Sequence, residues 1–439
     1  MLKITMVGTG YVGLVSGACF SEFGFSVTCV DKDADKIASL KAGAIPIYEP
    51  GLDSLVASNR EQNRLFFTTD LASAVASSAL IFIAVGTPGR RSGGAVDMTY
   101  VDAAAREIAE AIEGFKVVVT KSTVPVGTAR RIDSIIREAR PDADFAVASN
   151  PEFLREGSAI EDFMRPDKIV VGVEEDRARE LLATAYRPLS LRDAPLIFTD
   201  FETAELIKYA NNSFLAMRLS FVNELADLCE ATGANISEAT HALGKDRRIG
   251  PYFLHPGPSY GGSCFPTDTK ALVAIGEEAG SRMRSIETAI EINDRRKQQM
   301  VDRISAAMDG SVKGKRIAIL GIAFKPNTDD IREAPALAII PALQELGGEV
   351  VAHDPAAMPA AEPELPGVIW KDDPLDAVED ADALVILTEW NLYRGLDLKA
   401  VAGLMRGNVL IDLRNIFTLE EVSKLPFAYH SLGRPAVGV

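Results

Sequence analysis

The opening of the chain places the tightest constraint on the fold. An apolar strand is predicted at residues 3–7, the turn Gly8-Thr-Gly10-Tyr-Val-Gly13 follows it, and a small-residue helix leads to a second apolar strand at 26–30. Parallel strands that are buried on both faces are continuously apolar, and a crossover helix joins each strand to the next. This β–α–β unit therefore predicts a doubly wound parallel sheet.

The alternation of strands and helices continues and then gives way to helices alone. Three more apolar strands are predicted, at 80–85, 116–120 and 145–148. Between about residues 202 and 307 the pattern is almost purely helical, with long helices predicted at 203–232 and 285–308. A helix of about thirty residues is about 45 Å long, enough to connect two lobes or to form a dimer seam.

The last third of the chain repeats landmarks of the first. A strand at 315–321 corresponds to 3–8, a strand at 348–355 that contains Asp354 corresponds to 26–31, and a strand at 383–388 corresponds to 80–85. The repeat predicts an α/β fold with two Rossmann-like doubly wound domains, joined by a central all-helical domain with a long helix. The predicted domains are 1–200, 201–308 and 309–439.

Only the first of these two domains is predicted to bind a dinucleotide. The second glycine turn, Gly321-Ile-Ala-Phe-Lys325, lacks the full glycine fingerprint. We therefore expect the C-terminal domain to bind a different ligand.

Composition narrows the classes of partner. The 439 residues carry a formal net charge of −16, which disfavours binding to nucleic acid or to an anionic membrane. A few local bases and helix N-termini still permit an anionic small molecule. The four cysteines have no C-x-x-C spacing, so no metal site is expected, and the absence of a signal-like segment predicts a cytoplasmic protein.

The first glycine turn has the residues that dinucleotide binding requires. Gly8 permits the tight turn, Gly10 lets the backbone approach the pyrophosphate, and Gly13 lets the helix pack on the strand. Asp31 ends the next strand, where a carboxylate accepts both ribose hydroxyls and repels a 2′-phosphate, so NAD is expected rather than NADP. The alternative is that Asp31 caps the helix that begins near Ala34.

Two other turns follow strands at the edge where doubly wound sheets bind ligands. Thr87 lies in Gly86-Thr-Pro88, and Thr123 lies in Lys121-Ser-Thr-Val-Pro125. An ordinary strand-end turn explains either segment equally well.

Cys264 has the surroundings of a nucleophile. It lies in Tyr260-Gly-Gly-Ser-Cys264-Phe-Pro-Thr-Asp268, and a helix is predicted to begin at Thr267. A helix N-terminus favours the thiolate, and the glycines leave space for a substrate carbon. A core position is the alternative, and it is the one expected for Cys19, Cys29 and Cys229.

Two pairs of polar residues complete the candidate centre. Lys208 and Asn212 are spaced i, i+4 on a predicted helix and can stabilise an oxyanion, although a solvent-facing lysine is the alternative. Glu152 and Glu156, in Asn150-Pro-Glu-Phe-Leu-Arg-Glu-Gly, follow a strand and can position water or cap the next helix.

Taken in order, these motifs resemble the UDP-glucose 6-dehydrogenases of the wider UDP-glucose/GDP-mannose dehydrogenase family, over nearly the whole chain. Besides the segments above, the resemblance rests on Tyr48-Glu-Pro-Gly51, Gly321-Ile-Ala-Phe-Lys325 and Thr388-Glu-Trp. It implies two successive NAD-dependent oxidations of UDP-glucose to UDP-glucuronate by a homodimer.

The resemblance also implies roles for individual residues. Cys264 attacks the aldehyde from the first oxidation to give a thiohemiacetal, which the second oxidation converts to a thioester. Lys208 and Asn212 stabilise the oxyanion, Thr123 and Asp268 hold and activate water, and Glu152 assists hydrolysis.

Two sets of binding residues follow from the same resemblance. The expected cofactor contacts are Gly8, Gly10, Tyr11, Val12, Gly13, Asp31, Lys36, Thr87, Thr123, Glu156 and Arg332. The expected nucleotide-sugar contacts are Glu152, Phe153, Leu154, Glu156, Lys208, Asn212, Arg248 from across the dimer interface, Tyr252, Tyr260, Gly261, Lys325 and Arg414. The chain departs from the family pattern at Thr267 and His255, where lysine is usual, so the charge balance around the thiolate and the diphosphate must differ.

Other functions remain compatible with the sequence. Within the family, a UDP-N-acetylhexosamine or GDP-mannose is an alternative substrate. A one-step β-hydroxyacid dehydrogenase also uses a helical Lys and Asn but needs no nucleophilic cysteine, and a non-enzymatic nucleotide-binding regulator is the third possibility.

Overall fold

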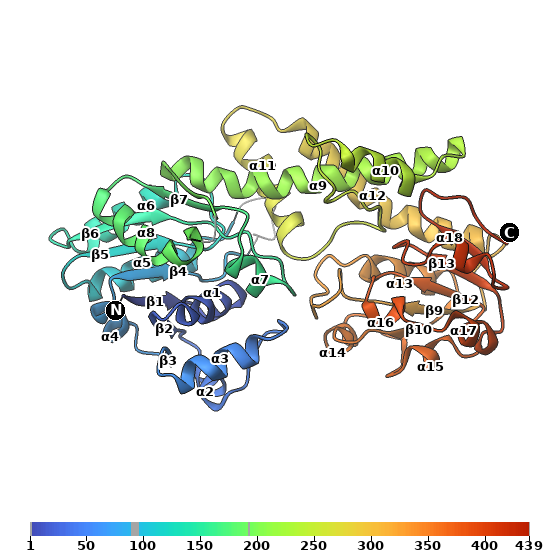
Figure 1. Cartoon of the computed structure of the whole chain (residues 1–439), viewed down its shortest axis with the longest axis horizontal. Coiled ribbons are helices and arrows are strands. Elements are labelled where there is room, and N and C mark those ends of the chain that lie inside the picture. The colour runs from blue at the N-terminus through green and yellow to red at the C-terminus, as the bar shows by residue number, and fades with distance from the viewer. Residues whose placement is uncertain (1, 89–95, 192–193, 439) are drawn as a thin grey trace. The chain divides into compact units, whose positions relative to one another are not determined.

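The computed structural model describes residues 2–88, 96–191 and 194–438 (Figure 1). The chain divides into two compact units, Met1–Asn211 and Asn212–Val439. Helix α9 (Phe201–Thr232) begins in the first unit and ends in the second. Its 32 residues correspond to a length of about 48 Å. The long helix predicted at 203–232 is therefore present and begins two residues earlier.

The first unit alternates strands and helices from its first residues. Its elements are β1 (Lys3–Val7), α1 (Tyr11–Glu22), β2 (Ser26–Val30), α2 (Ala34–Ala42), α3 (Leu52–Glu61), β3 (Leu65–Thr68), α4 (Leu71–Ser77), β4 (Leu80–Ile83), α5 (Thr99–Ala111), β5 (Lys116–Thr120), α6 (Thr128–Ala139), β6 (Phe145–Ser149), α7 (Ala159–Met164), β7 (Ile169–Val173), α8 (Asp176–Ser190) and β8 (Leu196–Thr199).

These strands form one sheet in the order β3-β2-β1-β4-β5-β6-β7-β8. The first six are parallel, which confirms the predicted doubly wound sheet. Strand β7 is antiparallel to β6, and β8 is parallel to β7. The sequence prediction did not include β3, β7 or β8, because short apolar runs cannot be distinguished from buried helical segments by their pattern.

The side chains of β4 point alternately to the two faces of the sheet, and this explains why every residue of the strand is apolar. Leu80 and Phe82 belong to the hydrophobic core on one face of the sheet, whereas Ile81 and Ile83 belong to the core on the other. Successive side chains of a strand point to opposite faces, so helices on both sides require every position to be apolar. The strand ends at Ile83 rather than at residue 85, because its neighbours β1 and β5 pair with it no further.

The second unit contains the rest of the helices and a second sheet. Its elements after α9 are α10 (Ile236–Lys245), α11 (Cys264–Glu278), α12 (Arg284–Ala307), β9 (Arg316–Leu320), α13 (Ala336–Glu345), β10 (Glu349–His353), α14 (Met358–Ala361), β11 (Ile369–Trp370), α15 (Pro374–Val378), β12 (Ala383–Ile386), α16 (Asn391–Arg394), α17 (Leu398–Leu404), β13 (Val409–Asp412), α18 (Leu419–Val422) and β14 (Ala428–Ser431). The parallel strand order is β11-β10-β9-β12-β13-β14.

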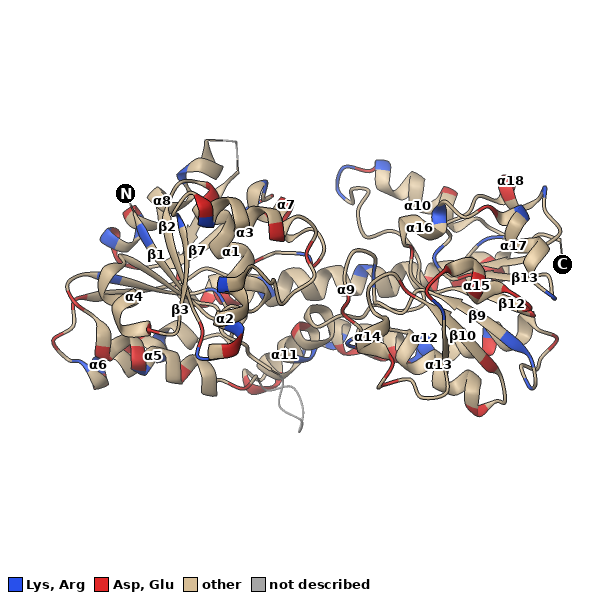
Figure 2. Ribbon diagram, turned by 90° about the horizontal axis from the view of Figure 1, so that it is seen from below, with Lys and Arg blue, Asp and Glu red and all other residues tan. Residues whose placement is uncertain are grey.

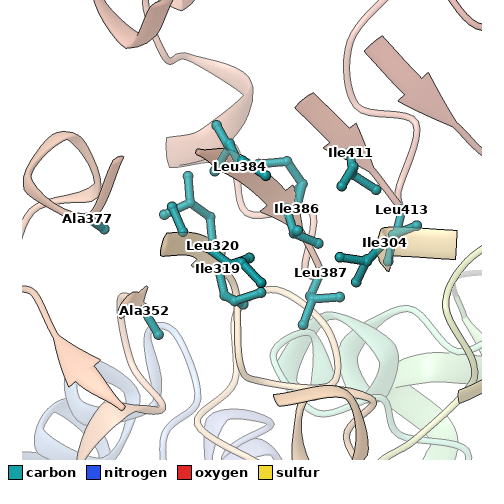
Figure 3. Close-up of a cluster of buried hydrophobic side chains, with 14 of the residues drawn as sticks. Ile304, Ile319, Leu320, Ala352, Ala377, Leu384, Ile386, Leu387, Ile411 and Leu413 are labelled. Atoms are coloured by element: carbon teal, nitrogen blue, oxygen red, sulfur yellow. The ribbon is translucent and has the colours of Figure 1, made fainter. Parts of the chain in front are cut away.

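One continuous core holds the second sheet to the end of α12. Ile319, Leu384 and Ile411 come from three neighbouring strands, and Ile304 approaches from α12 (Figure 3). All four side chains are fully buried. Burial of this kind stabilises a fold by about 1.5–3 kcal/mol for each large aliphatic side chain. The C-terminal part of α12 is therefore packed as part of this sheet's core.

The internal repeat predicted from the sequence is present at the level of hydrogen bonds. Gly8 and Gly321 follow the first strand of each sheet with φ of +105° and +99°. Their N–H groups donate to the carbonyls of Val30 (2.7 Å) and His353 (3.0 Å), at the ends of the two second strands. The same turn therefore begins both halves.

Charged residues of both signs are interspersed over the helices and loops (Figure 2). Acidic residues outnumber basic ones by 62 to 46. Among the residues described, the structure contains no helix with the length and apolar character that crossing a membrane requires.

We predict that Gly321→Ala destabilises the second unit by about 2–4 kcal/mol. A Cβ at this position would lie 2.4 Å from Thr388 Cβ and 2.5 Å from Thr388 N, and φ is positive, so overlap and backbone strain add together. Gly403→Ala is the matched control, because Gly403 lies in α17 with nothing within 4 Å of the added atom. It should be neutral or stabilising by up to about 1 kcal/mol. Thermal and urea unfolding test both, and equal effects would contradict the prediction.

Candidate active site

The first glycine turn has the shape that a dinucleotide requires. A Cβ on Gly13 would lie 2.0 Å from the Gly8 carbonyl oxygen, so helix α1 packs directly on the turn. A Cβ on Gly10, the N-cap residue of α1, would meet nothing within 4 Å. That open space lies at a helix N-terminus, where N–H groups and the macrodipole favour phosphate. The turn therefore fits the pyrophosphate of NAD.

Asp31 lies at the end of β2 and contacts this turn. Its carboxylate accepts hydrogen bonds from Thr9 N (3.0 Å) and Thr9 Oγ1 (2.7 Å), and from the Lys36 ammonium (3.2 Å). Burial opposes ionisation, but these bonds and one from Asp33 N outweigh it and lower the pKa of Asp31 to about 2. The side chain that caps α2 is Asp33, not Asp31. The alternative role for Asp31 as a helix cap is therefore wrong.

The corresponding acid in the second unit is fully enclosed. Asp354 is 0% exposed and accepts hydrogen bonds from the N–H groups of Ile322, Ala323, Ala356 and Ala357 and from the indole of Trp390. A carboxylate has about four acceptor positions, so none is left for a ribose. Only the first unit retains an accessible acid at this position.

Lys208 and Glu152 form a buried ion pair in the first unit. Their Nζ and Oε1 atoms lie 2.7 Å apart, and the two side chains are 4% and 6% exposed. Glu152 also accepts a hydrogen bond from Leu154 N. The alternatives of a solvent-facing Lys208 and of a helix cap at Glu152 are therefore wrong. Phe153 lies beside the pair, with its ring centroid 5.7 Å from Lys208 Nζ.

Asn212 forms the second buried pair. It lies one turn beyond Lys208 on α9, and its Nδ2 donates to Asp268 Oδ2 over 2.6 Å. Asp268 lies in the first part of α11 and is 3% exposed. Helix α9 therefore carries one member of each buried pair.

Cys264 is the first residue of α11 and is partly exposed. The prediction that this helix begins at Thr267 was wrong by three residues, because Pro266 is accommodated in the first turn. The Sγ atom of Cys264 lies 3.6 Å from Ser263 Oγ. The sulfur therefore lies at the helix N-terminus, four residues before Asp268.

The other cysteines are core residues, as predicted. Cys19, Cys29 and Cys229 are at most 3% exposed. Burial raises the pKa of Cys19 and Cys29 to about 12, so these thiols stay protonated.

Four of the predicted nucleotide-sugar residues lie close together in the second unit. Tyr260 is buried, and a Cβ on Gly261 would lie 3.1 Å from the Phe324 side chain, next to Lys325. The Arg414 guanidinium donates to the Phe324 carbonyl (3.0 Å). It also borders Gly257, where an added Cβ would lie 2.9 Å from it.

The remaining predicted residues are less constrained by contacts. Arg248 is 89% exposed in its side chain and pairs with its neighbour Asp246, and Tyr252 is 76% exposed. The exposed Arg332 pairs with Asp330, and its carbonyl accepts from Gly262 N, two residues before Cys264. The other predicted cofactor and nucleotide-sugar contacts are partly buried: Tyr11, Val12, Lys36, Thr87, Thr123, Phe153, Leu154 and Glu156.

A buried cluster of Lys121, Asn150 and Tyr186 is a feature that sequence reasoning missed. Lys121 Nζ lies 3.1 Å from Asn150 Oδ1, and the Tyr186 hydroxyl donates to the same oxygen. Burial lowers the pKa of Lys121 to about 8. Lys121 and Asn150 each directly follow a strand, β5 and β6, and that shared position is the signal that could have found them.

Comparison with known proteins finds one family along the chain. Its three domains match in order: the NAD binding domain at residues 2–190, the central domain at 202–295 and the UDP binding domain at 318–419.

Individual relatives agree with this match. A UDP-glucose 6-dehydrogenase of Rhizobium meliloti is 55% identical over 436 residues, covering 99% of this chain and 100% of the relative. A UDP-glucose dehydrogenase structure from Pyrobaculum islandicum has a TM-score of 0.91 at 36% identity, covering 99% and 98% of the two chains. A UDP-D-ManNAc dehydrogenase from Pyrococcus horikoshii has a TM-score of 0.85 at 26% identity and covers 99% of both. The chain belongs to the UDP-glucose/GDP-mannose dehydrogenase family.

Proposed function

We propose that this protein is an NAD-dependent dehydrogenase that oxidises C6 of UDP-glucose twice, to UDP-glucuronate. The observation that carries the proposal is the position of Cys264, a partly exposed thiol at the start of α11 and four residues before the buried Asp268. The 55% identical relative is a UDP-glucose 6-dehydrogenase, which supports the choice of substrate.

The first oxidation converts the C6 alcohol to an aldehyde and needs a group that stabilises the developing alkoxide. NAD held at the glycine turn by Gly8, Gly10 and Asp31 would accept the hydride from C6, with one NAD molecule for each of the two oxidations. Lys208 and Asn212 supply an ammonium and an amide from one face of α9, and both are held by buried acids. Donors that are already oriented stabilise charge without reorganisation.

The second oxidation requires the aldehyde to be retained. The Cys264 sulfur bonds to C6 and gives a thiohemiacetal, whose oxidation gives a thioester. Water then attacks C6, the C–S bond breaks, and the thiol and the sugar acid are released. Glu152 assists this hydrolysis, with Thr123 and Asp268 holding the water.

The UDP moiety is held mainly by the second unit. Arg414 and Lys325 provide positive charge for the diphosphate, and Tyr260 and Gly261 border the sugar. Phe153, Leu154 and Tyr252 complete the nucleotide-sugar set, and Arg248 joins it from the second protomer. The match of residues 318–419 to the family's UDP binding domain supports this assignment.

The active form is a homodimer whose interface includes helix α9. Phe214, Phe221 and Leu228 are 54%, 57% and 56% exposed and are spaced by seven residues, so they form one apolar stripe along the helix. A seven-residue repeat keeps side chains on nearly the same helical face. Large exposed apolar side chains in a row mark an interaction surface.

The same proposal includes three domains, 1–200, 201–308 and 309–439, and a cytoplasmic location. Cys19, Cys29 and Cys229 are buried free thiols, as in proteins of a reducing compartment.

We predict that Cys264→Ser lowers kcat at least 100-fold and abolishes the formation of two NADH per UDP-glucose. The hydroxyl is a far weaker nucleophile than a thiolate and does not retain the aldehyde. Cys229→Ala is the control, since Cys229 is a core residue, and it should retain both equivalents. NADH absorbance with quantified UDP-glucose gives rate and stoichiometry. Two equivalents at an undiminished rate in Cys264→Ser would exclude covalent catalysis, and faster turnover of UDP-N-acetylglucosamine or GDP-mannose would exclude the proposed substrate.

We predict that the preference for NAD over NADP is constant from pH 7.5 to pH 9, where the 2′-phosphate of NADP is fully ionised. The pKa of Asp31 is lowered to about 2, so its carboxylate is ionised throughout this range. Asp31→Asn should lower the kcat/KM ratio of NAD to NADP at least tenfold, because the amide no longer repels a 2′-phosphate and Lys36 remains nearby. Asp33→Asn, which removes a helix cap but leaves Asp31, should leave the ratio unchanged. A ratio that varies with pH, or shifts equally in both variants, would contradict this assignment.

We predict that the protein sediments at twice its chain mass of 47.1 kDa and that Phe221→Asp makes it a monomer. A charge in the apolar stripe on α9 would be buried unpaired in the dimer. Leu346→Asp, at a leucine that is 51% exposed outside the stripe, is the control and should stay dimeric. Analytical ultracentrifugation decides, and a dimeric Phe221→Asp protein would rule out this surface.

A further inference from the structure

Helix α7 receives its N-terminal cap from a residue far away in the sequence. Its N-cap residue, Ser158, makes no side-chain hydrogen bond to the helix. Instead the Glu49 carboxylate accepts from Ala159 N (2.8 Å) and Ile160 N (3.4 Å), about 110 residues further along the chain. The first N–H groups of a helix have no partners within it, so this carboxylate satisfies them.

The same carboxylate also holds the residue before Ser158 and the tyrosine of the glycine turn. Glu49 Oε2 accepts from Gly157 N over 2.7 Å, and the Tyr11 hydroxyl donates to it. Gly157 N shares its proton with the Tyr11 oxygen, at 2.9 Å. Burial and the bond to Glu49 raise the pKa of Tyr11, so the phenol keeps the proton that it donates. Tyr11 is the first residue of α1.

A tight turn fixes Glu49 in position for its contacts with helix α7 and Tyr11. Leu52 N donates to the Glu49 carbonyl (3.1 Å), Pro50 follows Glu49, and Gly51 has φ of +83°. Proline at the second and a positive-φ glycine at the third position are typical of a type II turn. The side chain is buried, with 7% exposure. This contact accounts for the segment Tyr48-Glu-Pro-Gly51, to which the catalytic scheme gives no role.

Glu49 therefore joins two parts of the first unit that the proposed reaction uses together. One is the glycine turn at Tyr11. The other is the segment from Glu152 to Gly157, in which Glu152 pairs with Lys208 and Glu156 directly precedes Gly157.

We propose that Glu49 is a positioning residue that locks the segment 152–160 to the tyrosine of the glycine turn and so keeps the NAD site in its binding-competent form. The role rests on the proposed function, since it concerns the same site. In this role Glu49 acts through its contacts with Tyr11 and Gly157.

Glu49→Gln tests the role with little change in shape. The amide keeps one oxygen for the α7 N–H groups but presents an NH2 to Gly157 N, which places donor against donor, and the Tyr11 hydroxyl loses its acceptor. We expect the Kd for NADH, measured by fluorescence titration of the full-length protein without sugar, to rise about tenfold. Tyr11→Phe removes the donor to Glu49 and the second acceptor for Gly157 N but leaves the Glu49 carboxylate in place, and about a threefold rise is expected.

Hydrogen exchange provides a second readout. The amides of Gly157, Ala159 and Ile160 should lose protection in Glu49→Gln, and NADH should restore it in part. Asp382→Asn is the matched control: its carboxylate accepts from Arg316 N (2.8 Å) and from the Arg406 guanidinium in the second unit. This control should lower the melting temperature without changing the Kd for NADH.

The outcomes separate this role from a purely structural one. A Glu49→Gln protein that is less stable but binds NADH with an unchanged or lower Kd overturns the proposal. If Glu49→Gln does not fold, an unchanged Kd and unchanged exchange in Tyr11→Phe overturn it equally. Failure of the wild-type protein to reduce NAD with UDP-glucose would overturn the proposed function, while the NADH titration would still decide the role of Glu49.

Discussion

The fold depends on one interaction that occurs in each half of the chain: a carboxylate at the end of the second strand accepts backbone N–H groups from the turn after the first. Asp31 binds Thr9 N, and Asp354 binds Ile322 N and Ala323 N. The bond fixes the glycine turn while the parallel ladders fix the strands. Both sheets therefore present a defined turn at the edge where ligands bind in this fold.

The difference between these two acids separates the roles of the two sheets. Asp31 keeps a side chain that is 20% exposed and has Lys36 as its charged neighbour, so it can still meet a ribose. Asp354 is saturated by backbone groups and by the Trp390 indole. Although the two sheets share their architecture, the second cannot bind a dinucleotide in the same way, because Asp354 has no acceptor position left. The family's UDP binding domain matches this second sheet.

Sequence reasoning predicted the features that arise from local pattern and failed where long-range contacts decide. The β–α–β units, the repeat and the long helix α9 follow from apolar periodicity, and the glycine fingerprint locates Asp31. The role of Glu49 could not be predicted, because its partners are far away in the sequence. The position of Lys121 after a strand could have marked it as a candidate, but its contact with Asn150 required the fold. The spacing of Lys208 and Asn212 indicated a shared face, but their burial and their acid partners required the fold. The residue roles in the reaction, and the domain boundaries, stay predictions.

The start of α11 has a chemical consequence for the cysteine. Cys264 is the first residue of α11, and its N-cap residue Ser263 makes no side-chain bond to the helix. The helix N-terminus therefore supplies its partial positive charge to the sulfur, without a neighbouring ammonium at 267. The thiolate is the form that the proposed capture of the aldehyde requires, and release of the acid from the thioester then depends on the water held near Glu152 and Asp268.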